Sequence, residues 1–528
     1  MTTVRDVTYD LLRARGLTTI FGNPGSNELP FLSGLPTDFR YILGLHEGAV
    51  LSMADGYSLV TGDTTLINLH AASGSGNAMG ALTNSVYSHS PLVVTAGQQV
   101  RSTIGQEVML SNVDAGSLMK PLVKWSSEPT CAEDVPRTMS QAITMAALPA
   151  KGPVYVSIPY DDWAADAPTE TARLLERDVH SAAALSGEQI SSLVGLLESA
   201  ANPVLVLGPA VDADHANDDA VRLAEKLRVP VWIAPSPCRC PFPTRHPSFR
   251  GVLPAGVRDL SSALSGHDLI LVVGAPVFRY HQHLPGRYLP EGARLIQVTD
   301  DPGEAARAPI GEAFVAPIGN TLAVLASIVE PSDRLPLPQL ADFKEPESAG
   351  PGLDPEHLFA LVRAAAPDDA IYVNESTSTA DAFWSQMALA HQGSYYFPAS
   401  GGLGFGLPAA VGAQLGCPQR QVIGLIGDGS ANYGITALWT AARYRIPVVI
   451  IILKNGTYGA LRGFSKILNT GDTPGLDVPG IDFVNIAQGY GVRGTAVASA
   501  ADFVTAFKSA LAAEVPTLIE VHTHFEKP

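Results

Sequence analysis

The feature that most constrains the fold is an alternation between short apolar runs and segments of helical spacing. Most of the runs end at glycine, proline or histidine. This alternation predicts buried parallel strands joined by helices, and hence doubly wound α/β domains with mainly parallel sheets. The predicted strands lie in TTIFGNPG, TTLINLH, PLVVTAG, GPVYVSIP, NPVLVLGP, VPVWIAP, DLILVVGAP, ARLIQVTDD, AIYVNES, QVIGLIGDG, PVVIIILKN and PTLIEVHT.

Two linkers without periodicity divide the chain. They are AADAPTETARLLERDVHSAAALSGEQ and the Pro-rich, acidic EPSDRLPLPQLADFKEPESAGPGLDPEH. Because 528 residues are too many for one core, we expect three domains. Their predicted limits are 1–180, 181–340 and 341–528.

Composition excludes several classes of partner. The chain has 34 basic and 51 acidic residues, a net charge of −17, which disfavours nucleic acid and anionic membranes. No apolar run approaches the roughly 18 residues of a membrane span, and the first residues lack the apolar core of a signal peptide. We therefore expect a soluble cytoplasmic protein, with its four cysteines as reduced buried thiols.

The stretch LIGDGSANYG places a carboxylate, Asp428, between two glycines at the end of a predicted strand. One helix is expected to follow, with Ile435, Leu438, Trp439 and Ala442 on one face. Ligands of open α/β sheets bind at this edge, and a helix N-terminus attracts phosphate. A carboxylate beside phosphate requires a cation between them, and Mg²⁺ has the required preference for oxygen ligands.

The next predicted strand ends at Asn455, whose amide oxygen converges on the same point. The unit formed by GDGS, a helix, a strand and Asn455 resembles the diphosphate–magnesium motif of thiamin-diphosphate-dependent enzymes. In that family two asparagines end the motif, whereas here the first is Lys454, which strand alternation directs away from the metal. The resemblance implies Mg²⁺, with Ca²⁺ as a substitute, on Asp428, Asn455 and the carbonyl of Thr457. It implies cofactor contacts at Gly427, Gly429, Ser430, Tyr458 and Gly459.

Glu47, in YILGLHEGAV, follows a short predicted strand and opens a helix. Taken alone it could be an acid that the helix dipole favours in a first turn. Beside the metal motif it resembles the glutamate that activates the cofactor's pyrimidine ring, so a catalytic role is expected.

Further segments resemble the benzoylformate decarboxylases over all three domains. They include FGNPGSNELPF with Asn23, Pro24, Gly25 and Ser26, INLHAASGSGNAMG with His70, and GAPVFRYHQHLPG with His281. The resemblance implies two cofactor domains flanking a Rossmann-like middle domain. It also implies active sites shared between subunits of a homodimer or homotetramer.

The resemblance implies non-oxidative decarboxylation of benzoylformate through an ylide and an enamine, with carboligation as a side activity and a place in the mandelate pathway. Ser26 is expected to bind the substrate carboxylate. His70 would protonate the alkoxide, and His281 the enamine carbon.

His46, His89 and His283 are expected to be structural. Further cofactor contacts are expected from Thr377, Ser378, Gly401 and Leu403, and the aryl pocket from Met109, Leu110, Phe397, Ala460, Leu461 and Phe464, with Gly463 widening its mouth.

Several alternatives stay open from the sequence. The substrate could be another 2-oxo acid, because a pocket that gains or loses a methylene discriminates only about 10–200-fold. An acetolactate-synthase-like carboligase or an oxidase would carry flavin, and the two histidines argue against the carboligase. A non-enzyme module is disfavoured because Glu47 and Asp428 are both present.

Overall fold

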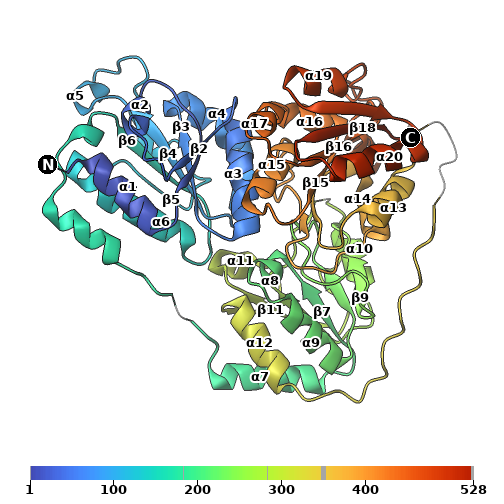
Figure 1. Cartoon of the computed structure of the whole chain (residues 1–528). Coiled ribbons are helices and arrows are strands. Elements are labelled where there is room, and N and C mark those ends of the chain that lie inside the picture. The colour runs from blue at the N-terminus through green and yellow to red at the C-terminus, as the bar shows by residue number, and fades with distance from the viewer. Residues whose placement is uncertain (1, 182, 282, 347–351, 525–528) are drawn as a thin grey trace.

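The computed structural model describes residues 2–181, 183–281, 283–346 and 352–524 (Figure 1). Their strands form three six-stranded sheets, and every strand pairs with its neighbours in parallel. The prediction of doubly wound, parallel α/β architecture is therefore confirmed. The three sheets occupy separate lobes, coloured blue, green to yellow, and orange to red along the chain.

The first sheet has the strand order β2-β1-β3-β4-β6-β5. Its strands are β1 (Thr19–Asn23), β2 (Arg40–Leu43), β3 (Thr65–Leu69), β4 (Leu92–Gln98), β5 (Trp125–Ser127) and β6 (Val154–Pro159). The helices are α1 (Val4–Ala14), α2 (Leu29–Leu32), α3 (Glu47–Thr61), α4 (Ala71–Tyr87), α5 (Arg101–Ile104) and α6 (Val135–Ala147).

The third sheet repeats that order as β14-β13-β15-β16-β18-β17. Its strands are β13 (Ile371–Glu375), β14 (Tyr395–Tyr396), β15 (Val422–Gly427), β16 (Val449–Lys454), β17 (Arg493–Val497) and β18 (Thr517–His522). The helices are α13 (Pro355–Ala365), α14 (Ala380–Gln386), α15 (Gly406–Gly416), α16 (Asp428–Gly434), α17 (Ala437–Arg443), α18 (Gly459–Leu468), α19 (Phe483–Gly489) and α20 (Ala500–Leu511).

The middle sheet differs, with the order β9-β8-β7-β10-β11-β12. This is the arrangement 3-2-1-4-5-6 of dinucleotide-binding folds. The strands are β7 (Pro203–Leu207), β8 (Val231–Ile233), β9 (Phe249–Val252), β10 (Leu269–Val273), β11 (Arg294–Thr299) and β12 (Glu312–Val315). The helices are α7 (Gly187–Ser199), α8 (Pro209–Ala213), α9 (Asn217–Leu227), α10 (Val257–Ala263), α11 (Pro302–Arg307) and α12 (Ile318–Ile328).

The strands that sequence patterning missed all lie at sheet edges. They are β5, β9, β12, β14 and β17. An edge strand has a neighbour on one side only, so it needs no continuous apolar run. In β12 and β17 most residues are exposed, and β14 has only two residues.

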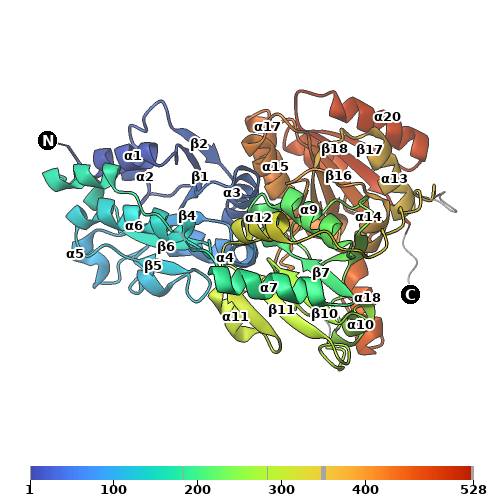
Figure 2. The ribbon, with the colours of Figure 1, turned by 90° about the horizontal axis from the view of Figure 1, so that it is seen from below.

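The first and third lobes are held together by direct contact between α3 and α15, which lie side by side in both views (Figures 1 and 2). A Cβ added at Gly412 would lie 1.8 Å from the carbonyl oxygen of Met53, and one at Gly56 would lie 2.1 Å from that of Ala409. Only glycine allows the two backbones to approach so closely. This pairing fixes the two cofactor-type sheets relative to each other.

All four cysteines are free. Cys238 and Cys240 are buried as expected, whereas Cys131 is exposed and Cys417 is half-buried, so the expectation of burial was wrong for these two. Within the described ranges, the helices include none with the length and apolarity needed to cross a membrane.

Candidate active site

Asp428 lies at the carboxyl end of β15 and is the first residue of α16. Its side chain is 3% exposed. The carboxylate accepts hydrogen bonds from the backbone N–H groups of Gly429, Asn455 and Gly456 at 2.9, 3.1 and 2.7 Å. Burial raises the pKa of this carboxyl, and the three N–H donors oppose that shift. The contacts hold Asp428 against the turn that follows β16.

Asn455 and Thr457 form that turn. The Asn455 side-chain oxygen accepts a hydrogen bond from the Thr457 N–H at 2.9 Å, and Gly456 between them has the left-handed φ of 71°. The Thr457 hydroxyl donates to the carbonyl of Leu476, and the Arg462 guanidinium donates to that hydroxyl. The structure thus brings a carboxylate, an amide oxygen and the Thr457 segment together at the carboxyl ends of β15 and β16 in the third sheet.

Lys454 does not join this group of oxygen ligands. Its ammonium donates to Glu520 on β18 at 2.7 Å, and the side chain of Glu520 is almost fully buried. Lys454, which replaces the family's first asparagine, therefore forms an ion pair with a neighbouring strand of the same sheet.

The helix expected after Asp428 is interrupted. The structure has two helices, α16 and α17, with the break at residues 435–436. Gly434 at the end of α16 lies against Pro408 of α15, where an added Cβ would be 2.5 Å from the proline ring. Of the four residues predicted to share one face, only Leu438 is fully buried. The prediction of one continuous helix was wrong: α16 ends at Gly434, at the point where it packs tightly against α15.

Glu47 opens α3 and is 7% exposed. Its carboxylate oxygens accept hydrogen bonds from the side-chain amides of Asn23, at the end of β1, and Asn77, on α4 (3.1 and 3.0 Å). A Cβ at Gly74 would lie 3.2 Å from Glu47, so the small residues of α4 let that helix approach the carboxylate. His46 is structural, as expected, because its ring accepts from the Gly48 N–H and caps α3.

His70 follows β3 and occupies the N-cap position of α4. Its Nδ1 lies 2.8 Å from the Glu28 carboxylate, whose side chain is fully buried. Ser26 lies in the same loop as Glu28, is exposed, and has its hydroxyl 3.2 Å from the Asn27 side-chain oxygen. Sequence reasoning missed Glu28 and Asn77. A signal existed for Asn77, which stands seven residues after His70 and so shares its helix face.

His281 comes from the middle lobe and is exposed. Its ring meets Phe464 of α18 edge to face, with centroids 4.6 Å apart and an interplanar angle of 69°. The structure therefore unites one predicted catalytic histidine with one predicted pocket residue. The short turn Thr377–Thr379, which holds the cofactor candidates Thr377 and Ser378, packs against the same helix.

The loop before α15 carries Gly401 and Leu403 and is tied to the first lobe. Asn84 of α4 accepts from the Ser400 N–H and hydroxyl at 3.0 and 2.7 Å and donates to the Gly402 carbonyl at 2.9 Å. Gly401 has a left-handed φ of 78°, which favours glycine. This loop is held in place for contact with a ligand.

Glu375, at the end of β13, was also missed. Its buried carboxylate accepts from the N–H groups of Gly404, Phe405 and Gly406 at the start of α15. Burial raises the pKa of Glu375 to about 8, against the effect of these three donors. The glutamate fixes the beginning of α15 and hence the loop that carries Gly401.

Not all predicted pocket residues come together. Met109, 85% exposed, and Leu110, 37% exposed, lie on a loop of the first lobe. Ala460, Leu461 and Phe464 lie on α18 of the third lobe, and Phe397 packs in the core beside Tyr395. In a single chain, the described residues show no hydrogen bond or ring contact that links Met109 or Leu110 to α18.

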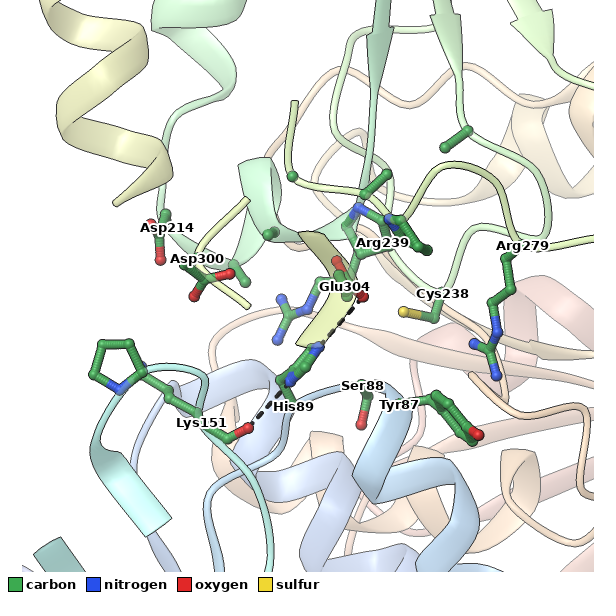
Figure 3. A pocket seen from close by; sticks show the side chains of 18 of the residues that line it. Tyr87, Ser88, His89, Lys151, Asp214, Cys238, Arg239, Arg279, Asp300 and Glu304 are labelled. Carbon is green, nitrogen blue, oxygen red and sulfur yellow. Dashed lines mark hydrogen bonds and ion pairs between the residues drawn. The ribbon is translucent and has the colours of Figure 1, made fainter. Parts of the chain in front are cut away.

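A cavity of about 1030 Å³ lies elsewhere, between the first and middle lobes (Figure 3). It is bordered by the loop after α4 and by the strand ends of the middle sheet, and none of the predicted site residues lines it. His89 bridges the two lobes there, with its Nδ1 3.1 Å from the Lys151 carbonyl and its Nε2 3.8 Å from Glu304. Burial lowers the pKa of His89, but Glu304, Asp300 and the Lys151 carbonyl together offset this and leave the pKa raised. His89 thus has partners in both lobes.

The residues present fit thiamin diphosphate and its metal. Asp428, Asn455 and the Thr457 carbonyl are all oxygen donors, which is the donor set Mg²⁺ prefers. Lys454 is engaged with Glu520, so it does not neutralise Asp428 by direct contact. Glu47 is a buried carboxylate with neutral amide partners, which suits a protonated ring nitrogen as a further partner.

Known thiamine pyrophosphate enzymes resemble this chain over its whole length. Three family models match, for the N-terminal (residues 2–118), central (190–325) and C-terminal (377–521) domains of thiamine pyrophosphate enzymes. Benzoylformate decarboxylase from Pseudomonas aeruginosa is 62% identical over 100% of both chains. The solved 4-hydroxybenzoylformate decarboxylase from Rhodococcus jostii is 83% identical over 100% of both chains, with a TM-score of 0.99.

A more distant relative marks the boundary of this group. The large subunit of acetolactate synthase isozyme 1 from Escherichia coli is 29% identical over 98% of this chain and 93% of its own. Identity to the Pseudomonas and Rhodococcus decarboxylases is more than twice this value, and the resemblance inferred from the motifs is confirmed. The chain belongs to the thiamine pyrophosphate enzymes, in the benzoylformate decarboxylase family.

Proposed function

We propose that this protein decarboxylates an aromatic 2-oxo acid, benzoylformate or its 4-hydroxy derivative, to the corresponding benzaldehyde and CO₂. The observation that carries this proposal is the end-to-end identity to 4-hydroxybenzoylformate decarboxylase. In this chain Glu47 and Asp428 are the first residues of α3 and α16, His70 directly follows β3, and His281 lies in the loop after β10 against Phe464. Carboligation is proposed as a side activity.

Asp428, Asn455 and the Thr457 carbonyl would bind Mg²⁺ or Ca²⁺, and the backbone at Gly429 and Ser430 would face the diphosphate. Thiamin diphosphate, when bound, supplies the nucleophilic carbon and the electron sink that decarboxylation needs. Gly401 and Leu403, on the loop tied to α4, would contact its pyrimidine end, with Thr377 and Ser378 on the side of α18.

The remaining residues handle protons and the substrate carboxylate. Glu47 would hold and release a proton at the pyrimidine nitrogen, oriented by its two amide partners. Ser26, exposed on its loop, would donate to the substrate carboxylate. His70 would deliver a proton to the substrate carbonyl oxygen, and His281, beside Phe464, to the carbon that loses CO₂.

We propose that the complete site forms between subunits of at least a dimer, and that the enzyme is a tetramer. Apolar side chains are exposed on both parts of the predicted pocket: Met109 and Val113 on the first-lobe loop, and Leu461, Ile467 and Leu468 on α18. Exposed apolar groups of this kind indicate an interface. A partner chain would bring the loop of one subunit to α18 of the other.

Mixing of inactive subunits tests this arrangement. Glu47→Ala and Asp428→Ala chains, each inactive alone, should recover activity when refolded or co-expressed together. Random pairing gives half heterodimers with one intact site of two, so about a quarter of wild-type activity is expected. Mass spectrometry shows whether heterodimers have formed in the mixture. If they have formed and no activity is recovered, Glu47 and Asp428 of the same chain must lie in one site.

A kinetic panel tests the substrate. Benzoylformate and 4-hydroxybenzoylformate should have higher kcat/KM than pyruvate, 2-oxobutanoate or phenylpyruvate. An aryl ring removes far more apolar surface from water than a methyl group, which at about 25 cal/mol per Å² is worth a few kcal/mol. If pyruvate or phenylpyruvate has the highest kcat/KM, the proposed pocket around Leu461 and Phe464 is wrong.

The flavin-dependent alternatives are tested separately. A carboligase of the acetolactate synthase type or an oxidase would bind flavin and absorb visible light, whereas the proposed decarboxylase should be colourless. The visible spectrum of the purified holoenzyme, with the CO₂ and aldehyde released from benzoylformate, distinguishes them.

A further inference from the structure

The Glu28 carboxylate spans the carboxyl ends of three adjacent strands of the first sheet, β1, β3 and β4. Its Oε1 accepts from the N–H of Gly97 at the end of β4 (2.8 Å) and from that of Ala71 after β3 (3.1 Å). Its Oε2 accepts from the Gly25 N–H after β1 (2.9 Å) and lies 2.8 Å from Nδ1 of His70. No residue proposed above for catalysis has so many partners.

Two glycines leave room for the contact between Glu28 and His70. A Cβ added at Gly25 would lie 2.1 Å from His70 Nδ1, and one at Gly97 would lie 2.4 Å from Glu28 Oε1. Real side chains do not approach so closely, so both positions need glycine. These two glycines leave the space in which the imidazole and the carboxylate meet.

The hydrogen-bond pattern determines which nitrogen of His70 carries the proton. Three of the four partners of Glu28 are backbone N–H groups, which only accepting oxygens satisfy. A carboxylate cannot donate to the imidazole, so Nδ1–H of His70 must be the donor. The other ring nitrogen, Nε2, is then the one left for proton exchange with a substrate.

We propose that Glu28 is the positioning residue of His70: it fixes the Nδ1–H tautomer, holds the ring plane and stabilises the protonated ring while Nε2 gives up its proton. The inference rests on the proposed function of His70. Glu28 acts through His70 alone and does not touch substrate or cofactor.

A double-mutant cycle separates positioning from general support of the fold. Glu28→Gln keeps the shape of the side chain but puts an amide donor toward His70 or toward a backbone N–H. It should lower kcat about 10–100-fold, the range typical of residues that orient a functional histidine, and change KM little. In a His70→Ala background the same substitution should change kcat less than twofold, because the residue it acts through is absent.

A matched control is available in the same lobe. Asp55 on α3 is a buried carboxylate that accepts from the hydroxyls of Ser85 and Ser90 and lies outside the site. Asp55→Asn should leave kcat unchanged in both backgrounds. An equal loss from Glu28→Gln with and without His70 would overturn the proposal, as would a Glu28→Gln enzyme with wild-type kcat.

The tautomer can be read without changing Glu28 and without turnover. In ¹⁵N-histidine-labelled holoenzyme, with the His70 signals identified by their loss in His70→Ala, the neutral ring should carry its proton on Nδ1. A neutral ring protonated on Nε2 would refute the proposal even if Glu28→Gln is inactive or unfolded. If His70→Ala retains the wild-type rate, the catalytic role of His70 fails, while the tautomer measurement still decides the role of Glu28.

Discussion

The first and third lobes share one strand order but carry different chemistry at the carboxyl ends of their strands. In the first lobe these positions hold Asn23, Glu28 and His70, with Glu47 opening α3. In the third they hold Asp428 and Asn455. In the proposed function one scaffold would supply proton carriers and the other oxygen ligands for a metal, so the sheet would decide where functional groups lie and not what they do.

Two buried glutamates show how the two lobes diverge. Glu28 accepts three backbone N–H hydrogen bonds from the carboxyl ends of strands and the residues that follow them, and Glu375, itself at the end of β13, accepts three from the start of α15. The carboxylate oxygens of Glu375 bind the start of α15, whereas those of Glu28 also have a fourth partner, His70. The same device supports the backbone in one lobe and, in our proposal, orients a catalytic side chain in the other.

The largest effect is expected in the third lobe, from Asp428→Ala. Loss of the carboxylate should remove the metal, and with it the diphosphate and all measurable activity. Chelation of the wild-type enzyme should do the same, and Mg²⁺ with thiamin diphosphate should restore it. Cofactor content after gel filtration is the measurement, and normal cofactor binding by Asp428→Ala would disprove the metal bridge.

In the first lobe, Glu47→Gln should separate binding from chemistry. The amide can still accept from Asn23 but cannot carry a proton, so cofactor content should stay normal while kcat falls about 10⁴-fold, the upper end of acid–base effects. Exchange of the C2 proton of bound thiamin diphosphate, followed by NMR, reads this step directly. Wild-type exchange in the variant would contradict the assigned role.

The two histidines should fail differently. His70→Ala and His281→Ala should each lose about 10²–10⁴ in kcat, as expected for positioned acid–base groups. His70→Ala should stall before CO₂ is lost and His281→Ala after it. Acid quench followed by NMR of the bound species measures this, and identical profiles in the two variants would rule out the division between lobes.

The smallest effect is expected from Lys454→Asn, which installs the family's asparagine pair. It leaves Glu520 without its ammonium partner, so the free energy of unfolding should fall by about 1–2 kcal/mol. Cofactor affinity should change less than threefold. The double variant Lys454→Asn/Glu520→Gln should recover most of the stability. A large loss of cofactor affinity would show that Lys454 contributes to the metal site.

The sequence alone determined the interior strands of each sheet and the residues that follow them. A strand that is buried on both faces must be apolar throughout, so the residue at which it ends can be recognised in the sequence. Asp428, Asn455, Glu47 and His70 were found because they stand at such ends or at helix starts close after them. The strict spacing of GDGS and Asn455 made the family resemblance recognisable without any knowledge of contacts.

Only the tertiary structure decided the partners of those residues. Edge strands lack a distinctive pattern, and the break between α16 and α17 lies where Gly434 packs against Pro408 of another helix. Glu28 is an ordinary loop acid in sequence, and its role appears only when β1, β3 and β4 bring Gly25, His70 and Gly97 to one point. Local patterns report burial, whereas hydrogen bonds between distant segments depend on how the sheets and helices pack.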